Sequence, residues 1–450
     1  MATGGVTAAG GAGGSSSSST CSPPTCGPAV TDFFDNGKLA TIRITFDPAD
    51  TGSYTPAQWL DLLWSKQTHC PPFDKSTLVR VAFEYESPDG KGNIKIQDVG
   101  MRLRGSKGKG VNQLQGFKLD FQKLLGTAIG PARRRFADTN RLNTLSIEGD
   151  SSHLMQCLSY QMLRDFGLPA PYCNHLKVYV NGTYYGLMES VEEPEIGRFL
   201  QHHFGSTAGE TYEGSPSQGD CTGPDRFYDG QAKLLYSGAT FASYTSQFKI
   251  TRGDASTAES HLLPMLKCGD ALQTPDDAAF KTCISDWIDV SEWLKQIAAE
   301  SLMPQVESFM VERNFLLYFV PDATAPHGGR FQLASYDFDK SFQTATCSPG
   351  NCDPFASTAS WYPASGGTRA KLATRLTTVF KAEYCVAMKN FLTNVFKPES
   401  VDAMANVIAP GMADDPTTPM TSWKTDVVGM RAFIANHGPS AQATVNAACP

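Results

Sequence analysis

Residues 99–121 of this chain read VGMRLRGSKGKGVNQLQGFKLDF. Apolar and polar side chains alternate in residues 99–104 and again in residues 116–121, a pattern typical of half-buried strands. The segment between them is rich in glycine and lysine, and small residues let backbone N–H groups approach phosphate groups. We therefore expect a strand, a glycine-rich basic loop and a second strand. The loop lacks Walker A and G-x-G-x-x-G spacing, so a basic hairpin tip is an equally good interpretation.

Working outward from this stretch, the first half of the chain is expected to be rich in strands. Asn181-Gly182 between two alternating runs is a strong hairpin signal. An amphipathic helix should follow the basic strands, since Gly167 and Pro169 mark its end. The expected strands are 40–46, 79–86, 175–180 and 183–188, and the expected helices are 55–64 and 150–166.

The second half is expected to be rich in helices. Residues 203–269 are predicted to be mostly loop, residues 286–303 helical, and residues 315–320 and 331–336 a pair of strands. Helical periodicity then dominates residues 371–447. Strands followed by helices indicate an α+β fold.

Composition restricts the classes of function. The formal net charge is -7, so sequence-independent binding to nucleic acid is not expected. No apolar run approaches the roughly 18 residues that a membrane span needs. The first residues, 1–31, are interpreted as a Gly/Ser-rich linker, and their composition suggests that a targeting segment has been removed from in front of them.

The chain has 12 cysteines, an even number. No C-x-x-C pair occurs, and the spacings Cys21-x4-Cys26 and Cys347-x4-Cys352 lie in loops rich in Ser, Pro and Gly. Small disulfide-closed loops in an oxidising compartment are therefore expected rather than zinc sites. The alternative is a cytosolic protein with unpaired, buried cysteines.

The sharpest chemical signal is Tyr336-Asp-Phe-Asp-Lys340, directly after an apolar strand. Asp337 and Asp339 can converge on a hard divalent cation, which prefers oxygen ligands. Asn314 opens the preceding strand, and Glu300 and Glu307 lie upstream, so an amide and further carboxylates are available. Taken alone, two such aspartates are more typical of a turn or a solvated strand end.

Lys118, on the strand after the basic loop, can neutralise phosphates bound there. Glu148 and Asp150 open the following helix, where an acid can pair with Lys118, but capping of the helix explains both equally well. No G-x-S-x-G or H-E-x-x-H motif occurs, and the histidines are scattered apart from His202-His203.

Taken in order, these pieces resemble the CotH kinase family, which includes spore-coat kinases and fungal surface proteins. The resemblance spans roughly residues 33–436. It is carried by the segments 99–105, 116–121, 141–154, 167–171, 178–186 with Glu192, 288–300, 314–318, 336–339 and 427–434.

The resemblance implies an atypical protein-kinase-like fold over residues 32–445. A β-rich N-lobe would span about 32–195, and a loop-rich segment with a helical C-lobe about 196–445. It implies an ATP-dependent and Mg²⁺- or Mn²⁺-dependent transferase that phosphorylates a protein outside the cytoplasm, whether secreted, periplasmic, in a coat or on the cell surface.

The resemblance also implies roles for individual residues. Glu307 would be the catalytic base, and Lys118 would act on the nucleotide phosphates. The implied nucleotide-binding residues are Arg104, Ser106, Lys118 and Glu192, and the implied metal ligands are Asn314, Asp337 and Asp339.

Two positions depart from the family's pattern. Glu307 stands where the family usually has Asp, and Tyr212-Glu213 stands where it often has Tyr-Lys. A longer carboxylate can still accept a proton, but an error of about 1 Å in geometry can cost on the order of 100-fold in rate. The alternative function is therefore a weak or inactive surface or adhesion module on the same fold.

Overall fold

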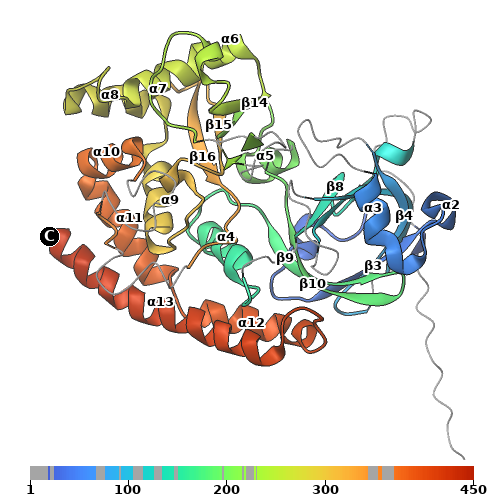
Figure 1. Cartoon of the computed structure of the whole chain (residues 1–450). Coiled ribbons are helices and arrows are strands. Elements are labelled where there is room, and N and C mark those ends of the chain that lie inside the picture. Colours follow the sequence, from blue (N-terminus) through green and yellow to red (C-terminus); the bar gives the residue numbers. More distant parts are fainter. Residues whose placement is uncertain are drawn as a thin grey trace, which may run out of the picture.

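The computed structural model shows an α+β fold in which a strand-rich body and a mainly helical body lie side by side (Figure 1). The residues that the structure describes are 19–20, 25–66, 77–90, 93–104, 115–125, 134–145, 150–194, 197–214, 217–218, 228–229, 231–342, 353–356 and 369–449.

The strand-rich body is a sheet that closes on itself. Its strands follow the order β5-β4-β3-β9-β10-β8-β6, and β6 pairs back onto β5, while the short β1 (Ser19–Thr20) adds to β5. The strands of the ring are β3 (Ala40–Phe46), β4 (Val79–Glu86), β5 (Ile94–Leu103), β6 (Phe117–Asp120), β8 (Arg141–Leu145), β9 (Cys173–Val180) and β10 (Thr183–Val191).

Alternation in the sequence explains why these strands enclose a core. In β4 every second residue from Val79 to Tyr85 is buried, and the residues between are partly exposed. Asn181 and Gly182 both have positive φ, 49° and 82°, which suits the tight turn that joins β9 to β10. The predicted hairpin is thereby confirmed.

The second body packs helices around a four-stranded antiparallel sheet. The sheet has the order β14 (Phe248–Arg252), β11 (Glu210–Gly214), β15 (Phe315–Pro321) and β16 (Gly329–Ser335). Its larger helices are α8 (Asp277–Trp287), α9 (Val290–Leu302), α10 (Lys371–Val379), α11 (Lys381–Asn394), α12 (Glu399–Met412) and α13 (Met420–Ala448). The prediction that residues 203–269 are mostly loop was wrong for β11, β14 and α7 (Leu263–Gly269).

Helix α4 (Met155–Asp165) connects the two bodies. It lies between barrel strands in the sequence, yet its side chains Leu158, Tyr160 and Leu163 belong to the core of the helical body. It begins five residues later than expected, because residues 150–154 form a turn that precedes the helix.

Shorter elements fill the connections. They are α1 (Val30–Phe33), α2 (Pro48–Thr51), α3 (Trp59–Ser65), α5 (Gly197–Phe204), α6 (Ala255–Thr257), η1 (Pro56–Gln58), η2 (Lys123–Leu125), η3 (Phe241–Tyr244), η4 (Ala258–Leu262), η5 (Phe309–Val311), β2 (Thr25–Cys26), β7 (Arg135–Phe136), β12 (Ser217–Gln218) and β13 (Tyr228–Asp229).

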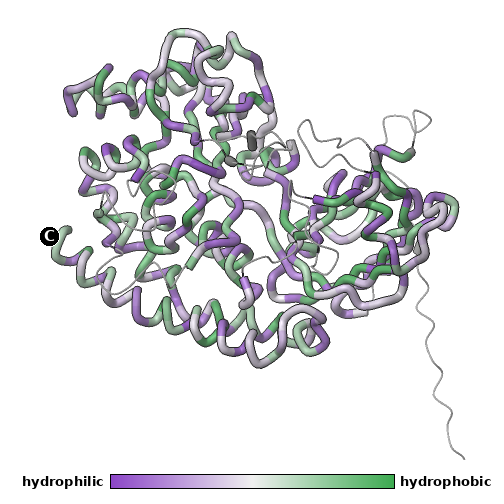
Figure 2. Tube along the Cα trace, viewed as in Figure 1, coloured by the Kyte–Doolittle hydropathy of each residue, from purple (hydrophilic) through white to green (hydrophobic). Residues whose placement is uncertain are grey.

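The long C-terminal helix α13 covers one side of the helical body, and hydrophobic and hydrophilic residues alternate along it (Figure 2). Its buried residues include Trp423, Met430, Ile434 and Val445, which recur at helical spacing and so form one apolar face. Among the described residues, no helix is both long and apolar enough to cross a lipid bilayer.

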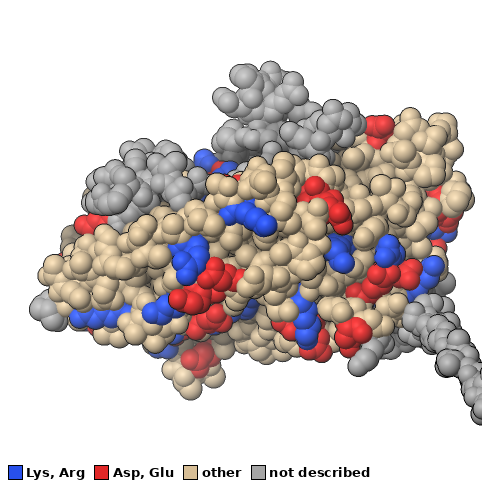
Figure 3. All heavy atoms as spheres, turned by 90° about the horizontal axis from the view of Figure 1, so that it is seen from below, with Lys and Arg blue, Asp and Glu red and all other residues tan. Residues whose placement is uncertain are grey.

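Figure 3 shows the molecule from below, relative to the view of Figure 1. Lys and Arg are interspersed with Asp and Glu on this face, so it presents no large area of one sign. Independently of this view, Arg431 of α13 and Asp402 of α12 form an exposed ion pair at 2.8 Å.

Disulfides join elements within and between the two bodies. Cys157–Cys173 links α4 to β9, Cys268–Cys283 links α7 to α8, and Cys385–Cys449 ties α11 to the end of α13. Cys26 is also disulfide-bonded, and no cysteine in the described part is free, so the expectation of disulfides is confirmed there, while the small loops expected at Cys21–Cys26 and Cys347–Cys352 stay predictions. Cys21, Cys347 and Cys352 lie outside the described residues.

Candidate functional site

The β15–β16 hairpin brings Asn314 and Asp337 together. Its register pairs Phe315 with Ser335, so the residues just outside the paired strands, Asn314 and Tyr336, are neighbours. The Tyr336 N–H donates to the Asn314 carbonyl at 2.9 Å, and the Asn314 amide donates to Asp337 Oδ2 at 3.4 Å. Two residues that are 23 positions apart in the chain thus share one site.

The backbone at this site is held in an unusual conformation. Asn314 and Asp337 have φ of 47° and 64°, in the left-handed region that non-glycine residues seldom adopt. The Asp337 N–H donates to the Tyr160 hydroxyl of α4 at 2.8 Å, and the Gln305 side chain donates to the Asp337 carbonyl. The fully buried Phe338 packs edge-on against Tyr160. Such conformations persist where the surroundings enforce them, often at functional sites.

Three carboxylates converge beside the amide. One oxygen each from Glu307, Asp337 and Asp339 lies within 4.8 Å of the others. Burial, followed by the charge of Asp337, raises the pKa of Asp339 to about 8, and Asp339 Oδ1 is buried without a hydrogen-bond partner among the described residues. Carboxylate and amide oxygens are the ligands that Mg²⁺ and Mn²⁺ prefer, so these residues fit such an ion.

Lys340 directly follows Asp339 and contacts the acid cluster through Glu307. Its Nζ lies 2.7 Å from Glu307 Oε1. Burial acts to lower the pKa of Lys340, but the hydrogen bond to Glu307 and the charges of the two aspartates raise it overall. Lys340 therefore stays charged beside the acids.

Glu300, the other upstream acid, does not join this cluster. It is fully buried, and it accepts hydrogen bonds from Ser335 Oγ at 2.5 Å, Gln296 Nε2 at 2.8 Å and the Met310 N–H at 3.2 Å. These contacts tie the end of β16 to the segment after α9. Glu300 thus positions the site without facing it.

Lys118 lies on β6 of the barrel, between Arg102 of β5 and Asn143 of β8. Its ammonium forms an ion pair with Glu193, which also lies 3.7 Å from Arg141. Burial lowers the pKa of Lys118, and the charge of Glu193 opposes this. A buried lysine requires such a partner, and an acid paired with a strand-borne lysine is the arrangement that protein kinases use beside nucleotide phosphates.

Glu192 faces away from Lys118. Its two carboxylate oxygens contact the histidines of α5, at 2.5 Å to His202 Nδ1 and 2.8 Å to His203 Nε2, and Oε2 also accepts the Tyr172 N–H. Burial raises the pKa of Glu192, but the hydrogen bonds of the two histidines lower it overall. The two histidines and Tyr172 thus already contact both carboxylate oxygens of Glu192. No contact shows a role of Glu192 in nucleotide binding among the described residues, and that role stays a prediction.

Arg104 directly follows β5, and its N–H donates to the Gly116 carbonyl at 2.8 Å. Its charge acts on the pKa of Glu193, and it opposes the upward shift that burial and Asp337 give to the pKa of Tyr160. Ser106, the other residue expected from the basic loop, lies outside the described residues.

Two acids, Glu148 and Asp150, precede α4 in the sequence. Asp150 accepts hydrogen bonds from the N–H groups of Ser152, Leu154 and Met155 at 2.7–2.9 Å, so capping of the helix is the better interpretation for it. Glu148 lies outside the described residues.

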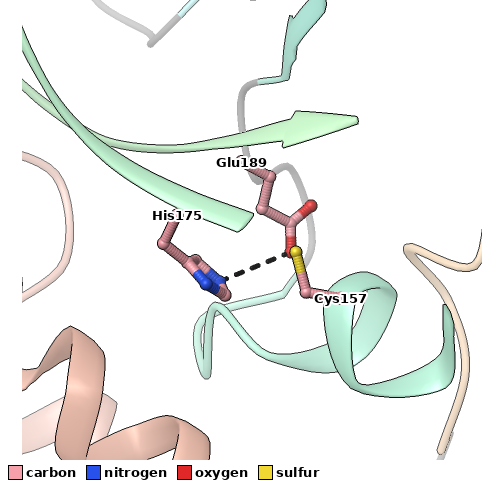
Figure 4. Close-up of side chains that lie close together, drawn as sticks. All are labelled: Cys157, His175 and Glu189. Carbon is pink, nitrogen blue, oxygen red and sulfur yellow. Dashed lines mark ion pairs between the residues drawn. The ribbon is translucent and has the colours of Figure 1, made fainter. Parts of the chain in front are cut away.

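Another possible ligand set, Cys157, His175 and Glu189, lies inside the molecule between α4 and the β9–β10 hairpin (Figure 4). His175 Nε2 is 3.8 Å from Glu189 Oε1. Cys157 is disulfide-bonded and offers no thiolate, while burial lowers the pKa of His175 to about 4 and raises that of Glu189. Since the Cys157 sulfur is bonded to Cys173, this group lacks a third ligand for a metal ion among the described residues.

Sequence reasoning missed Glu193 and the contact of Lys340 with Glu307. Glu192 and Glu193 are adjacent, so a pairing with Lys118 was available to either, and nothing in the local pattern chooses between them. Lys340 was visible in the motif, but the position of Glu307 depends on the fold of the segment after α9.

Comparison with protein families gives one match. Residues 102–438, most of the chain, match a family described as CotH kinase protein. No curated protein matches the chain. The match covers β6 with Lys118 and the whole acid cluster.

Proposed function

This chain belongs to the CotH kinase family, and on that premise we propose that it is a protein kinase that uses ATP with Mg²⁺ or Mn²⁺. The observation that carries the proposal is the convergence of Glu307, Asp337 and Asp339 beside the Asn314 amide. In this proposal the barrel and the helical body serve as the two lobes of a kinase-like fold, with the nucleotide bound between Lys118 and the acid cluster.

Asn314, Asp337 and Asp339 would hold the divalent ion. The ion would supply positive charge to the phosphates of the nucleotide and hold them in place. Lys118, kept in position by Glu193, would neutralise phosphate oxygens from the barrel side. Arg104, Ser106 and Glu192 are retained as proposed contributors to nucleotide binding.

Glu307 would serve as the base for the acceptor hydroxyl. As the hydroxyl oxygen forms a bond to the γ-phosphorus, the bond from phosphorus to the β–γ bridging oxygen breaks and its electron pair leaves with ADP. The hydroxyl proton passes to the Glu307 carboxylate and then to solvent. The products are a phosphorylated protein, ADP and one proton.

The acceptor is proposed to be a secreted, coat or cell-surface protein. The disulfides of the described part support an oxidising location, since such bonds persist outside the reducing cytosol. A coat or surface function is consistent with the family of the chain and awaits its own test.

The test is label transfer from γ-labelled ATP, in the presence of Mn²⁺ or Mg²⁺, to the chain itself and to a generic protein acceptor. Asp337→Asn should lower transfer on the order of 100-fold or more, because it removes a charge aimed at the ion. Asp402→Asn, at the exposed ion pair with Arg431, is the matched control and should transfer normally.

Thermal unfolding gives an independent measurement. Metal-bound nucleotide should raise the Tm of the wild-type chain and of Asp402→Asn, but not that of Asp337→Asn, because a specific ligand stabilises only the state that binds it. Absence of both label and stabilisation in a folded wild-type chain would overturn the kinase proposal in favour of a binding module on the same fold.

A further inference from the structure

Lys340 places a positive charge inside the acid cluster. Its Nζ is 2.7 Å from Glu307 Oε1, and the two side chains are 40% and 22% exposed. The pair is therefore neither a fully solvated surface contact nor a sealed internal one. Like the pair, Asp337 and Asp339 are only partly exposed.

The residues on either side of Asp339 and Lys340 anchor the backbone of this segment. Phe338 is fully buried against Tyr160, and Ser341 is fully buried with its hydroxyl 2.7 Å from the Ser159 hydroxyl of α4. Both neighbours of the Asp339-Lys340 pair are thus fixed to one helix. The backbone of Lys340 is therefore held at the site, while its side chain can exchange the contact with Glu307 for another.

Resting on the proposed function, we infer that Lys340 is a further catalytic residue, whose ammonium contacts the phosphoryl group in transfer while Glu307 anchors it. The oxygens of Asp337 and Asp339 lie within 4.8 Å of an oxygen of Glu307. Asp337 and Asp339 would hold the divalent ion, which would supply positive charge to the phosphates, and Lys340 lies beside the same cluster through its contact with Glu307.

The chemistry of the transfer favours a cation at this place. During transfer, negative charge spreads over the three equatorial oxygens of the phosphoryl group, and fixed positive charges stabilise it. Lys118 supplies such a charge from the barrel, and Lys340 supplies one from the helical body. Lys340 neither gains nor loses a proton in the step, and the hydroxyl proton still passes to Glu307.

A purely structural role makes a different prediction. If Lys340 only positions Glu307, its removal has no further effect once Glu307 is replaced. If Lys340 contacts the phosphoryl group, its removal lowers the rate in both backgrounds. A double-mutant cycle of Lys340→Met and Glu307→Gln separates the two roles.

The experiment is single-turnover label transfer from ATP with Mn²⁺ on the full chain. Lys340→Met should lower the rate about 100-fold. On the Glu307→Gln background it should still lower the rate about 10-fold or more, since transition-state contacts with charged groups are lost. Lys340→Arg should keep more activity than Lys340→Met, because it retains the charge. The matched control is Lys295→Met, at a 3.1 Å pair with Glu292 of similar exposure, and it should transfer normally.

The outcomes are distinguishable. A wild-type chain that neither binds metal-bound nucleotide nor transfers label overturns the proposed function and this inference with it. A wild-type chain that transfers label, beside a Lys340→Met that transfers equally well or has no effect on the Glu307→Gln background, overturns the inference alone. Thermal unfolding of Lys340→Met and Lys340→Arg shows whether a loss of rate reflects a loss of fold.

Discussion

Two groups of acids, one at the end of β10 and one at the end of β16, differ in how their charges are matched. After β10, Glu192 contacts two histidines, and Glu193 contacts Lys118 and lies near Arg141. Beyond β16, Asp337 and Asp339 converge with Glu307, which precedes β15 in the chain, and Glu307 contacts Lys340. The first arrangement stabilises the fold. The second leaves negative charge that a bound cation can satisfy, which is typical of a functional site.

The largest effect is expected when a matched charge at the β10 end is removed. Glu193→Gln removes the charged partner of Lys118. The cost is large because both side chains are mostly buried, Lys118 at 11% and Glu193 at 12% exposed. The loss should be about 3–5 kcal/mol of the free energy of unfolding, the usual cost of breaking a buried pair. Urea unfolding measures it as a lower midpoint at an unchanged m value.

The matched control for this change is Glu86→Gln, which breaks a more exposed pair with Arg43, 38% and 30% exposed. It should cost less than about 1 kcal/mol. If the two variants lose equal stability, the ion pair at the end of β10 stabilises the fold no more than an ordinary surface ion pair. The contrast between the acids after β10 and those after β16 would then be wrong.

A smaller effect of opposite sign is expected at the β16 end. Burial is the main cause of the raised pKa of Asp339, and the charge of Asp337 raises it further, which is a sign of repulsion between the two acids. Asp337→Asn should therefore stabilise the metal-free chain by about 1 kcal/mol, even though it abolishes the proposed transfer. Urea unfolding in the presence of a chelator measures this gain.

Addition of Mn²⁺ should reverse the order of the two proteins. The wild-type chain gains stability from the ion, whereas Asp337→Asn gains little. A metal-free Asp337→Asn that is less stable than the wild type would mean that the acid is needed for packing, and the contrast between the two ends would disappear.

The sequence predicted the strands better than it predicted their partners. Alternation identified β3 and β4 at their observed bounds, but closure of the barrel depends on the pairing of Arg102 with Lys118 and of Lys118 with Asn143 across distant segments. Strands β11 and β14 were missed because Glu210–Gly214 and Phe248–Arg252 are short and partly polar, so they lack a clear alternating pattern.

The same distinction holds for the site. Asn314 and Asp337 were predictable together, because one hairpin fixes their register. The choice of Glu193 rather than Glu192 as the partner of Lys118 was not, because adjacent acids on an extended chain face opposite sides and the sequence does not say which side meets the lysine. Local periodicity therefore located the candidate acids, and long-range pairing decided their partners.

The smallest effect concerns pH at the β10 end. The hydrogen bond to Glu192 raises the pKa of His202, whereas the two histidines lower the pKa of Glu192 against the effect of burial. The stabilising effect of His202 is fully present below its ordinary pKa of about 6.5 and is lost as pH rises through its raised value. That of Glu192 is present above its ordinary value and is lost as pH falls through its lowered one.

Stability from this contact should therefore be greatest near pH 6 and should fall by about 0.5 kcal/mol by pH 8, a modest value because the imidazole is partly solvated. Urea unfolding at the two pH values measures the fall, and His202→Gln should reduce it.

The wild-type curve alone is insufficient, because Asp339, whose pKa is about 8, also makes the native state less stable as pH rises. The difference between the wild type and His202→Gln cancels the contribution of Asp339, and the difference between the wild type and Asp339→Asn isolates it. If only Asp339→Asn flattens the curve, the histidines do not stabilise Glu192 by charge, and matched charge at the β10 end comes from Lys118 alone.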